Sequence, residues 1–460
     1  MTEATTAATL AQTGVSRTHE GGLWRLAPVV VALGSLALNA AALGHRSLSA
    51  GEATSAAQAQ GSPGTVLSHI FHDAPDQAGG LLALRLARTF GSGELTLRAP
   101  SAIAVALAAG LLVVLGTMLL GRLGGLVAGT LFAVDAGVVE AARDARPAAL
   151  GLLGVVAATL LLVVALKRGG GWRWIPYAIV AAALPLTHPL AASVLAAHGA
   201  ALIALRERDD LRRAGIALLA GTVVAGVLLA WMAADRADAA DGAGTLDLGR
   251  LAHGLAHPVG WNPVLVVAAI AGLYVLFRPD GGAPGHWRGV LVAALIAAPL
   301  AATVLAAIAL PVHTGALVLS APGIALAAAA SARLLTGTRG LVWAGLAPLL
   351  VASATTLAAR LTTAPSEDWR ALAAAVRSVR GTHETVVVIP PGSRDVFAYY
   401  APYVPVIGYA RGSGAWVAVS AATPAAAITA ARPFVPTPRY ALLRQFRYGD
   451  GLRLQHWVRP

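Results

Sequence analysis

Long apolar segments recur along the chain and are separated by short polar connections. Crossing a hydrocarbon core of about 30 Å takes about 20 residues of α-helix. The first segment, 26–43, has no clear signal-peptide cleavage site after it, and we interpret it as a retained helix. Ten further segments are predicted at 99–120, 123–139, 147–166, 174–187, 190–205, 214–234, 263–277, 289–309, 315–333 and 340–359. The pattern predicts an all-α polytopic membrane protein with about 11 transmembrane helices.

Basic residues distinguish the two sides of these predicted helices. Connections such as 167–173 and 206–213 are rich in Arg and Lys, whereas the connection 235–262 carries four Asp. Loops rich in Arg and Lys stay on the cytoplasmic side of a membrane. We therefore predict a multi-pass protein of the inner (plasma) membrane. Its expected parts are a cytoplasmic tail (1–25), a transmembrane domain (26–359) with a large outer loop (44–98), and an extracytoplasmic domain (360–460).

The composition agrees with a membrane protein. Of 460 residues, 57% are hydrophobic and 12% are charged, whereas soluble proteins carry about 25% charged residues. This excludes an ordinary cytosolic enzyme, a fibrous protein and a disordered chain. The net charge of +12 indicates contact with an anionic lipid leaflet rather than with nucleic acid. Because the chain has no Cys, disulfides, thiol catalysis and Cys-based zinc sites are excluded.

Two outer segments are too long to be simple connections. The first outer loop contains a helical pattern at 80–88, and loops of this length are usually functional or separately folded. The tail beyond Arg360 has a helical stretch at 368–379 and strand patterns at 385–389, 440–446 and 452–458. These elements predict a small extracytoplasmic α/β domain.

The first outer loop carries two sets of candidate catalytic residues. Glu52 is a candidate general base if apolar surroundings raise the pKa of its carboxyl toward neutrality, and otherwise a solvated acid. His69, His72 and Asp73 lie close together in sequence, and imidazole and carboxylate groups bind divalent metal ions. A metal site is therefore conceivable here, but the sequence requires no metal and no other cofactor.

Further candidates lie at predicted helix ends. Asp144 and Arg146 precede Pro147, a combination typical of a helix start; alternatively, Arg146 binds a lipid phosphate through a bidentate contact. His188 interrupts two apolar segments, and such a polar break is tolerated where it lines a cavity or is covered by protein. Residues 367–370 are an acidic helix start, which indicates a cap first and a site second.

Several short motifs occur in the order and spacing of a known family. The most specific is Gly91-Ser92-Gly93-Glu94-Leu95-Thr96-Leu97-Arg98-Ala99-Pro100-Ser101, which leads into the second predicted helix. It is followed by Asp144-Ala145-Arg146-Pro147-Ala148-Ala149-Leu150, Thr187-His188 and Asp368-Trp369-Arg370. With these motifs the chain resembles the GT-C polytopic glycosyltransferases, specifically their bacterial, protein-mannosyltransferase-like branch.

The resemblance implies an activity and a set of site residues. A mannose-like sugar would move, with inversion, from a polyprenyl-phosphate donor to a glycan, lipid or protein acceptor on the outer face. The resemblance implies that Glu52 accepts the acceptor's proton, with Asp73 as its substitute. Arg146 would stabilise the lipid phosphate, and His72, Asp144 and His188 would complete the substrate-binding group. No nucleotide-binding fingerprint is present, as expected for a lipid-linked donor.

The sequence also departs from the family pattern. The family's catalytic Asp falls at Gly51, its Pro-Pro-Tyr-Tyr run is replaced by 75–80, and its late Arg-Tyr pair is absent from 311–317. These departures leave open a catalytically silent relative that acts as a binding or assembly partner in cell-envelope glycan synthesis. A transporter of lipid-linked sugars is a third alternative, disfavoured by the long first loop and the few charges within the spans.

Overall fold

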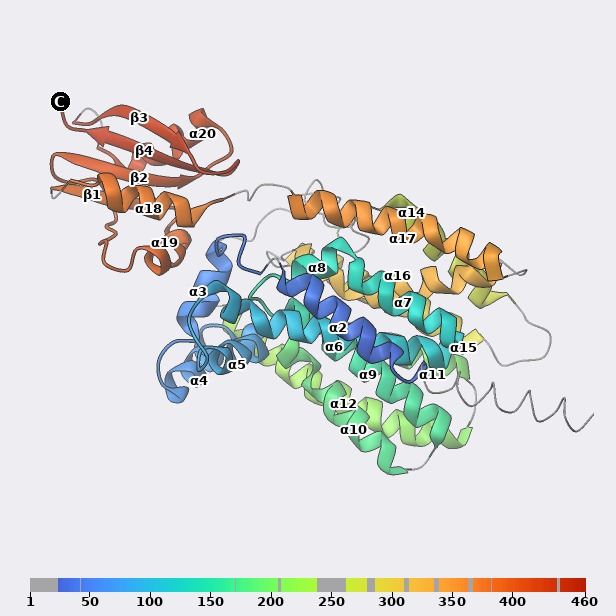
Figure 1. Cartoon of the computed structure of the whole chain (residues 1–460). Coiled ribbons are helices and arrows are strands. Elements are labelled where there is room, and N and C mark those ends of the chain that lie inside the picture. Colours follow the sequence, from blue (N-terminus) through green and yellow to red (C-terminus); the bar gives the residue numbers. More distant parts are fainter. Residues whose placement is uncertain are drawn as a thin grey trace, which may run out of the picture.

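The computed structural model describes residues 24–41, 43–169, 171–205, 208–237, 262–278, 286–309, 314–334, 339–362, 367–381, 383–436 and 439–460. A bundle of long helices carries a group of shorter helices and a small sheet domain at one end (Figure 1). Nearly all of the predicted tail 1–25 and most of the acidic connection 235–262 lie outside the described residues.

Every segment predicted to be an apolar helix is mainly helical where the structure describes it. The bundle helices are α2 (Ala27–Ala40), α6 (Glu94–Leu120), α7 (Arg122–Val134), α8 (Ala136–Ala142), α9 (Ala148–Arg168), α10 (Trp174–Thr187), α11 (Val194–Leu205), α12 (Arg208–Ala237), α14 (Pro263–Phe277), α15 (His286–Ala309), α16 (Ala321–Ala330) and α17 (Arg339–Thr362). Short 3-10 helices lie between some of them: η2 (Gly171–Arg173), η3 (Pro189–Ser193), η5 (Thr314–Ser320) and η6 (Ser331–Leu334).

Fewer of these helices qualify as membrane spans by length and composition. Among the described residues four do: Glu94–Leu120, Ala148–Arg168, Leu211–Trp231 and His286–Ala306. The bent pair α7 and α8 makes a fifth if it is counted as one span. Helices such as α2 and α10 have 14 residues, fewer than the usual minimum of about 17 for a span. The prediction of eleven transmembrane helices is therefore not confirmed, although the helices themselves are present.

The predicted single helix 123–139 is in fact two helices, α7 and α8, which meet at 62°. Asp135 has an extended backbone, and its carboxylate accepts a hydrogen bond from the N–H of Val138 at 3.0 Å. An Asp in this position is a good N-cap, because it satisfies a backbone N–H that has no partner within the helix. The same residue therefore ends one helix and begins the next.

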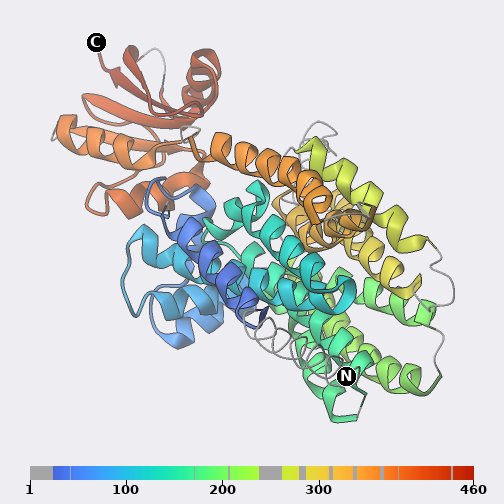
Figure 2. The same ribbon diagram turned by 45° about the vertical axis from the view of Figure 1, so that its right-hand side comes forward.

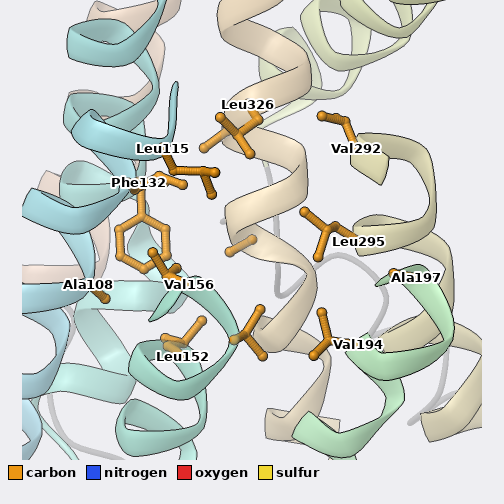
Figure 3. Close-up of a cluster of buried hydrophobic side chains, with 14 of the residues drawn as sticks. Ala108, Leu115, Phe132, Leu152, Val156, Val194, Ala197, Val292, Leu295 and Leu326 are labelled. Carbon is orange, nitrogen blue, oxygen red and sulfur yellow. The ribbon is translucent and has the colours of Figure 1, made fainter. Parts of the chain in front are cut away.

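The bundle core is built from closely packed apolar helices around α16. All ten residues of α16 are buried, and Leu326 of this helix faces Leu115 of α6 and Phe132 of α7 on one side (Figure 3). Leu295 of α15 lies on its other side (Figure 3). Small residues permit the close approach of other helices: a Cβ atom at Gly110 of α6 would lie 2.9 Å from the carbonyl oxygen of Pro28 in α2.

The first outer loop folds into short helices at one end of this bundle. They are α3 (Ala50–Gln58), α4 (Pro63–His72), η1 (Pro75–Gln77) and α5 (Ala78–Ala87). The pattern at 80–88 anticipated α5, whereas α3 and α4 were not predicted. Both have a Ser N-cap, Ser49 and Ser62, and these caps are the local sequence signals for their starts.

The tail forms the small α/β domain that the sequence predicts. Its elements are α18 (Trp369–Val379), β1 (Glu384–Ile389), η7 (Pro391–Ser393), α19 (Arg394–Tyr400), β2 (Gly414–Ser420), α20 (Pro424–Ala431), η8 (Arg432–Phe434), β3 (Ala441–Arg447) and β4 (Leu452–Val458). The sheet order is β1-β2-β4-β3, with β1 and β2 parallel and the other pairs antiparallel. Val417 of the unpredicted central strand β2 pairs with Val387 and Gln455.

The outer loop and the sheet domain share one apolar core. Leu48, Leu81 and Leu97 belong to the same buried cluster as Trp369 of α18 and Phe397 of α19. Both views show α18 and α19 between the sheet and the loop helices (Figures 1 and 2). The predicted boundary at residue 360 separates helix bundle from sheet in sequence, but in space the outer loop packs with the tail.

Candidate functional site

A buried ion pair joins the first outer loop to the start of α6. Arg98 donates from Nε and Nη2 to the two carboxylate oxygens of Glu52 at 2.7 and 2.8 Å, and both residues are 3% exposed. Its remaining N–H groups donate to the carbonyl oxygens of Leu43, Arg46 and Ser47 at 2.7, 2.8 and 3.0 Å. A guanidinium has about five N–H donors, and Arg98 uses them to fix the loop against α6.

The carboxylate of Glu52 is saturated with donors. Its Oε1 also accepts from the N–H of Ala145 at 3.0 Å, and its Oε2 accepts from the N–H of Ser49 at 2.8 Å. Burial opposes ionisation, but the hydrogen bonds and charge of Arg98, with these backbone N–H groups, outweigh burial and lower the pKa of Glu52. The expectation that apolar surroundings raise the pKa of Glu52 toward neutrality is therefore wrong. Glu52 as base stays a prediction, and one that this geometry disfavours.

Gly51, the position that the resemblance assigns to the family's catalytic Asp, lies against the guanidinium of Arg146. A Cβ atom at Gly51 would be 3.4 Å from both Cζ and Nε of Arg146 and 3.7 Å from Nη1. Arg146 is half-buried in the link between α8 and α9. An Asp at position 51 would therefore lie next to this cation. Because glycine has no side chain, position 51 does not cover this side of the guanidinium.

Asp144 lies in the same link, two residues before Arg146. Its Oδ1 is buried and has no hydrogen-bond partner among the described residues. Burial and the negative charge of Glu52 raise the pKa of Asp144 to about 7, although the positive charges of Arg146 and Arg98 act in the opposite direction. A carboxyl group that titrates near neutrality is unusual, and groups of this kind gather at functional sites.

Two glycine contacts hold the start of α9 against neighbouring segments, and a third joins α5 to α10. A Cβ atom at Gly80 would lie 3.4 Å from Cβ of Pro147, and one at Gly79 would lie 2.5 Å from the carbonyl oxygen of Leu186. On α9 itself, a Cβ atom at Gly151 would lie 2.8 Å from Cβ of His188. His188 caps η3 by accepting the N–H of Leu190 at Nδ1. The predicted residues Asp144, Arg146 and His188 are thus gathered around one helix start.

The remaining predicted residues lie elsewhere in the loop. Asp73 is exposed at the end of α4, where it contacts Nδ1 of His69 at 2.5 Å. His72 is also exposed, and its Nδ1–H donates to the carbonyl oxygen of Ser68. Within the described ranges, no three His, Asp or Glu side chains converge as a metal site requires. The structure therefore offers no support for a metal at residues 69–73.

The tail docks onto the loop through residues of two family-like motifs. Arg370 forms an ion pair with Glu94, and the hydroxyl of Tyr400 also donates to Glu94. The backbone N–H of Trp369, a fully buried residue, donates to Oγ of Ser47 at 3.3 Å. The motifs 91–101 and 368–370 are therefore parts of one interface, which the sequence did not reveal because 276 positions separate Glu94 from Arg370.

Residues 80–232 match the family profile described as "Dolichyl-phosphate-mannose-protein mannosyltransferase". The fold resembles that of ArnT from Cupriavidus metallidurans bound to undecaprenyl phosphate, with a TM-score of 0.54 and 13% identity over 94% of this chain and 98% of that one. The resemblance to the GT-C glycosyltransferases is confirmed. No curated protein sequence matches the chain significantly.

A second solved structure with this GT-C fold comes from an archaeon. The apo form of the Archaeoglobus fulgidus oligosaccharyltransferase aligns with a TM-score of 0.54 and 11% identity, over 83% of this chain and 64% of that one. Identities this low establish the fold alone. The GT-C fold therefore accounts for the helix bundle with its outer loop and tail domain, and the chemistry must be argued from the site itself.

Replacing Arg98 tests the role of the buried ion pair. Arg98→Met leaves the Glu52 carboxylate buried without its cation, and removing one partner of such a pair costs about 3–5 kcal/mol of unfolding free energy. Thermal unfolding of the detergent-solubilised protein measures the loss. Arg122→Met, at an exposed position at the start of α7, is the matched control. Equal melting temperatures for the two variants would contradict a structural role for this pair.

Proposed function

We propose that the chain is a membrane glycosyltransferase that moves a mannose-like sugar from a polyprenyl-phosphate donor to an acceptor hydroxyl on the outer face. The observation that carries this proposal is the guanidinium of Arg146 beside Gly51 at the start of α9. A half-buried guanidinium suits a phosphate, which it contacts through two parallel N–H groups. Solved relatives in fold support a lipid phosphate, because one is ArnT bound to undecaprenyl phosphate.

The proposed reaction needs a cation beside the leaving phosphate and a carboxylate that accepts the proton. The acceptor oxygen attacks the anomeric carbon, the bond from that carbon to the phosphate oxygen breaks, and the electron pair leaves with the lipid phosphate. Arg146 stabilises the negative charge that develops on this phosphate. The acceptor's proton passes to a carboxylate, and attack opposite the leaving group inverts the anomeric centre. The proposal needs no cofactor, and its other partner is the bilayer that holds the donor.

A silent relative remains the second candidate, and one observation favours it. Gly51 supplies no side chain where the family has its catalytic Asp, and the neighbouring Glu52 has its acceptor sites filled. In this alternative the chain binds the lipid-linked sugar at Arg146 without transferring it. Binding and transfer must therefore be measured separately.

The donor class is tested with purified protein in detergent. We expect transfer from a polyprenyl-phosphate sugar to an outer-envelope acceptor fraction and none from a nucleotide sugar, followed by mass spectrometry of the product. Arg146→Ala should lower transfer by about 10²-fold or more, the usual cost of losing one stabilising donor. Arg459→Ala, at an exposed position of the tail, is the matched control. Activity with the nucleotide sugar alone would refute the proposal.

Variants at Gly51 separate enzyme from silent relative. Gly51→Ala should keep lipid-phosphate binding, because its Cβ would make an ordinary contact with Arg146, whereas the larger Gly51→Leu should weaken it. Native mass spectrometry with undecaprenyl phosphate measures both. If the natural chain binds the donor without transfer and Gly51→Asp gains transfer, the silent alternative holds.

The proposed orientation has its own test. With the N-terminus cytoplasmic, reporter fusions at Arg208 and after Pro460 should lie on opposite sides of the membrane. Alkaline phosphatase and green fluorescent protein report the two sides, since the first is active only outside the cytoplasm and the second only inside. The same side for both fusions would contradict this orientation.

A further inference from the structure

Transfer requires a carboxylate with a free acceptor site near Arg146, and Glu52 does not offer one. Its two oxygens accept four hydrogen bonds, from Arg98 twice and from the N–H groups of Ala145 and Ser49. An ionised carboxylate has about four lone-pair sites, so a proton could enter only by displacing one of these donors. Asp73 is not a ready substitute, because it is exposed on α4 and contacts His69.

We propose that Asp144 is the catalytic base of this chain and accepts the proton of the acceptor hydroxyl. This inference rests on the proposed function. Three features of Asp144 carry it: it lies two residues from Arg146, its Oδ1 is buried, and that oxygen has no hydrogen-bond partner among the described residues. A buried, unpartnered carboxylate oxygen is costly, and such exceptions call for an explanation. An acceptor hydroxyl would supply the missing donor.

The hydrogen bond from Ala145 to Glu52 explains how Asp144 is held. The N–H of Ala145 donates to Oε1 of Glu52, which is itself fixed by Arg98. The peptide that links Asp144 to Ala145 is therefore tied to the buried ion pair of Glu52 with Arg98. Glu52 is in this way a positioning residue for Asp144.

Proton transfer to Asp144 balances the reaction. The acceptor O–H bond breaks as its oxygen bonds to the anomeric carbon, and the proton moves to Asp144. The anomeric carbon–oxygen bond to the phosphate breaks, and the phosphate leaves as a dianion beside Arg146. The protonated Asp144 then returns its proton to solvent or to the departing phosphate. No oxidant, reductant or further reactant is needed.

The charges around Asp144 suit this role. Burial raises its pKa, Glu52 and Glu140 raise it further, and Arg146 and Arg98 lower it, which leaves the pKa at about 7. A general base works best when its pKa lies near the working pH, because it is then both available and basic enough. The rate of transfer should therefore rise with pH up to about 7 and level off above it.

The substitutions Asp144→Asn and Asp144→Glu test the assignment. Asp144→Asn should lower kcat by about 10²- to 10⁴-fold, the usual contribution of a positioned base, while donor binding persists. Asp144→Glu keeps a carboxylate and should recover part of the rate. Asp450→Asn, an exposed acid of the tail domain, is the matched control for loss of an Asp. Transfer by Asp144→Asn at the rate of this control would overturn the proposal.

The pH profile gives a readout that a purely structural role would not move. Glu140→Gln removes a negative charge that raises the pKa of Asp144, so the acid limb of kcat/KM should shift to lower pH. An acid limb unaffected by Glu140→Gln, or one with its midpoint at the ordinary carboxyl value of about 4, would contradict Asp144 as base.

An infrared titration without substrate separates the inference from the proposed function. The protein should show a carboxylic acid C=O band that disappears with a midpoint of about pH 7 and is absent from Asp144→Asn. If the band is present but the natural chain transfers sugar from no polyprenyl-phosphate donor, the proposed function fails and the base assignment fails with it. If transfer occurs and the band is missing, the proposed function stands and Asp144 is not the base.

Discussion

The bidentate pair between Arg98 and Glu52 is the contact on which the outer half of the molecule depends. Arg98 binds the loop carbonyls of Leu43, Arg46 and Ser47, and Glu52 binds the backbone that leads to α9. A buried ion pair adds little net stability compared with apolar packing, because desolvating both charges is expensive. Its contribution here is geometric: few other arrangements of the loop would satisfy every donor and acceptor. This ion pair fixes how far α3, α6 and the link before α9 lie from one another.

The tail domain supplies part of the apolar core that stabilises the short helices of the first outer loop. Helices α3 and α4 have 9 and 10 residues, below the length of about 12–15 at which isolated helices become stable in water. They persist because Trp369 and Phe397 of the tail enter the same apolar cluster. Thr54 of α3 also donates to the carboxylate of Asp395 in α19 at 2.8 Å. The tail therefore stabilises the helix that carries Gly51, so that packing far along the chain sets the geometry near Arg146.

The helices and strands that could be predicted from the sequence are those with a local pattern of apolar and polar residues. Apolar runs identified the bundle segments, a short apolar run before a turn identified β1, and strand patterns on either side of a turn identified β3 and β4, because each signal lies within a few consecutive residues. Central strand β2 was missed since Gly414 and Ala415 at its start carry little strand preference. The candidate site was found only in part. Asp144 and Arg146 were predicted at a helix start and His188 at a break between two apolar segments, and the structure places them there. The partnership of Glu52 with Arg98 joins positions 46 residues apart and has no local signature.

The glycine at position 51 changes the charge balance of the site as well as its shape. Glu52 is already paired with Arg98. An Asp at position 51 would lie against Arg146 and neutralise part of its charge, and would thereby compete with a phosphate for the same guanidinium. With glycine there, Arg146 has one fewer carboxylate beside it, and a phosphate meets a stronger cation at that side. In the proposed reaction, glycine at position 51 therefore favours lipid-phosphate binding at Arg146 and leaves Asp144 as the acid of the link that can serve as the base.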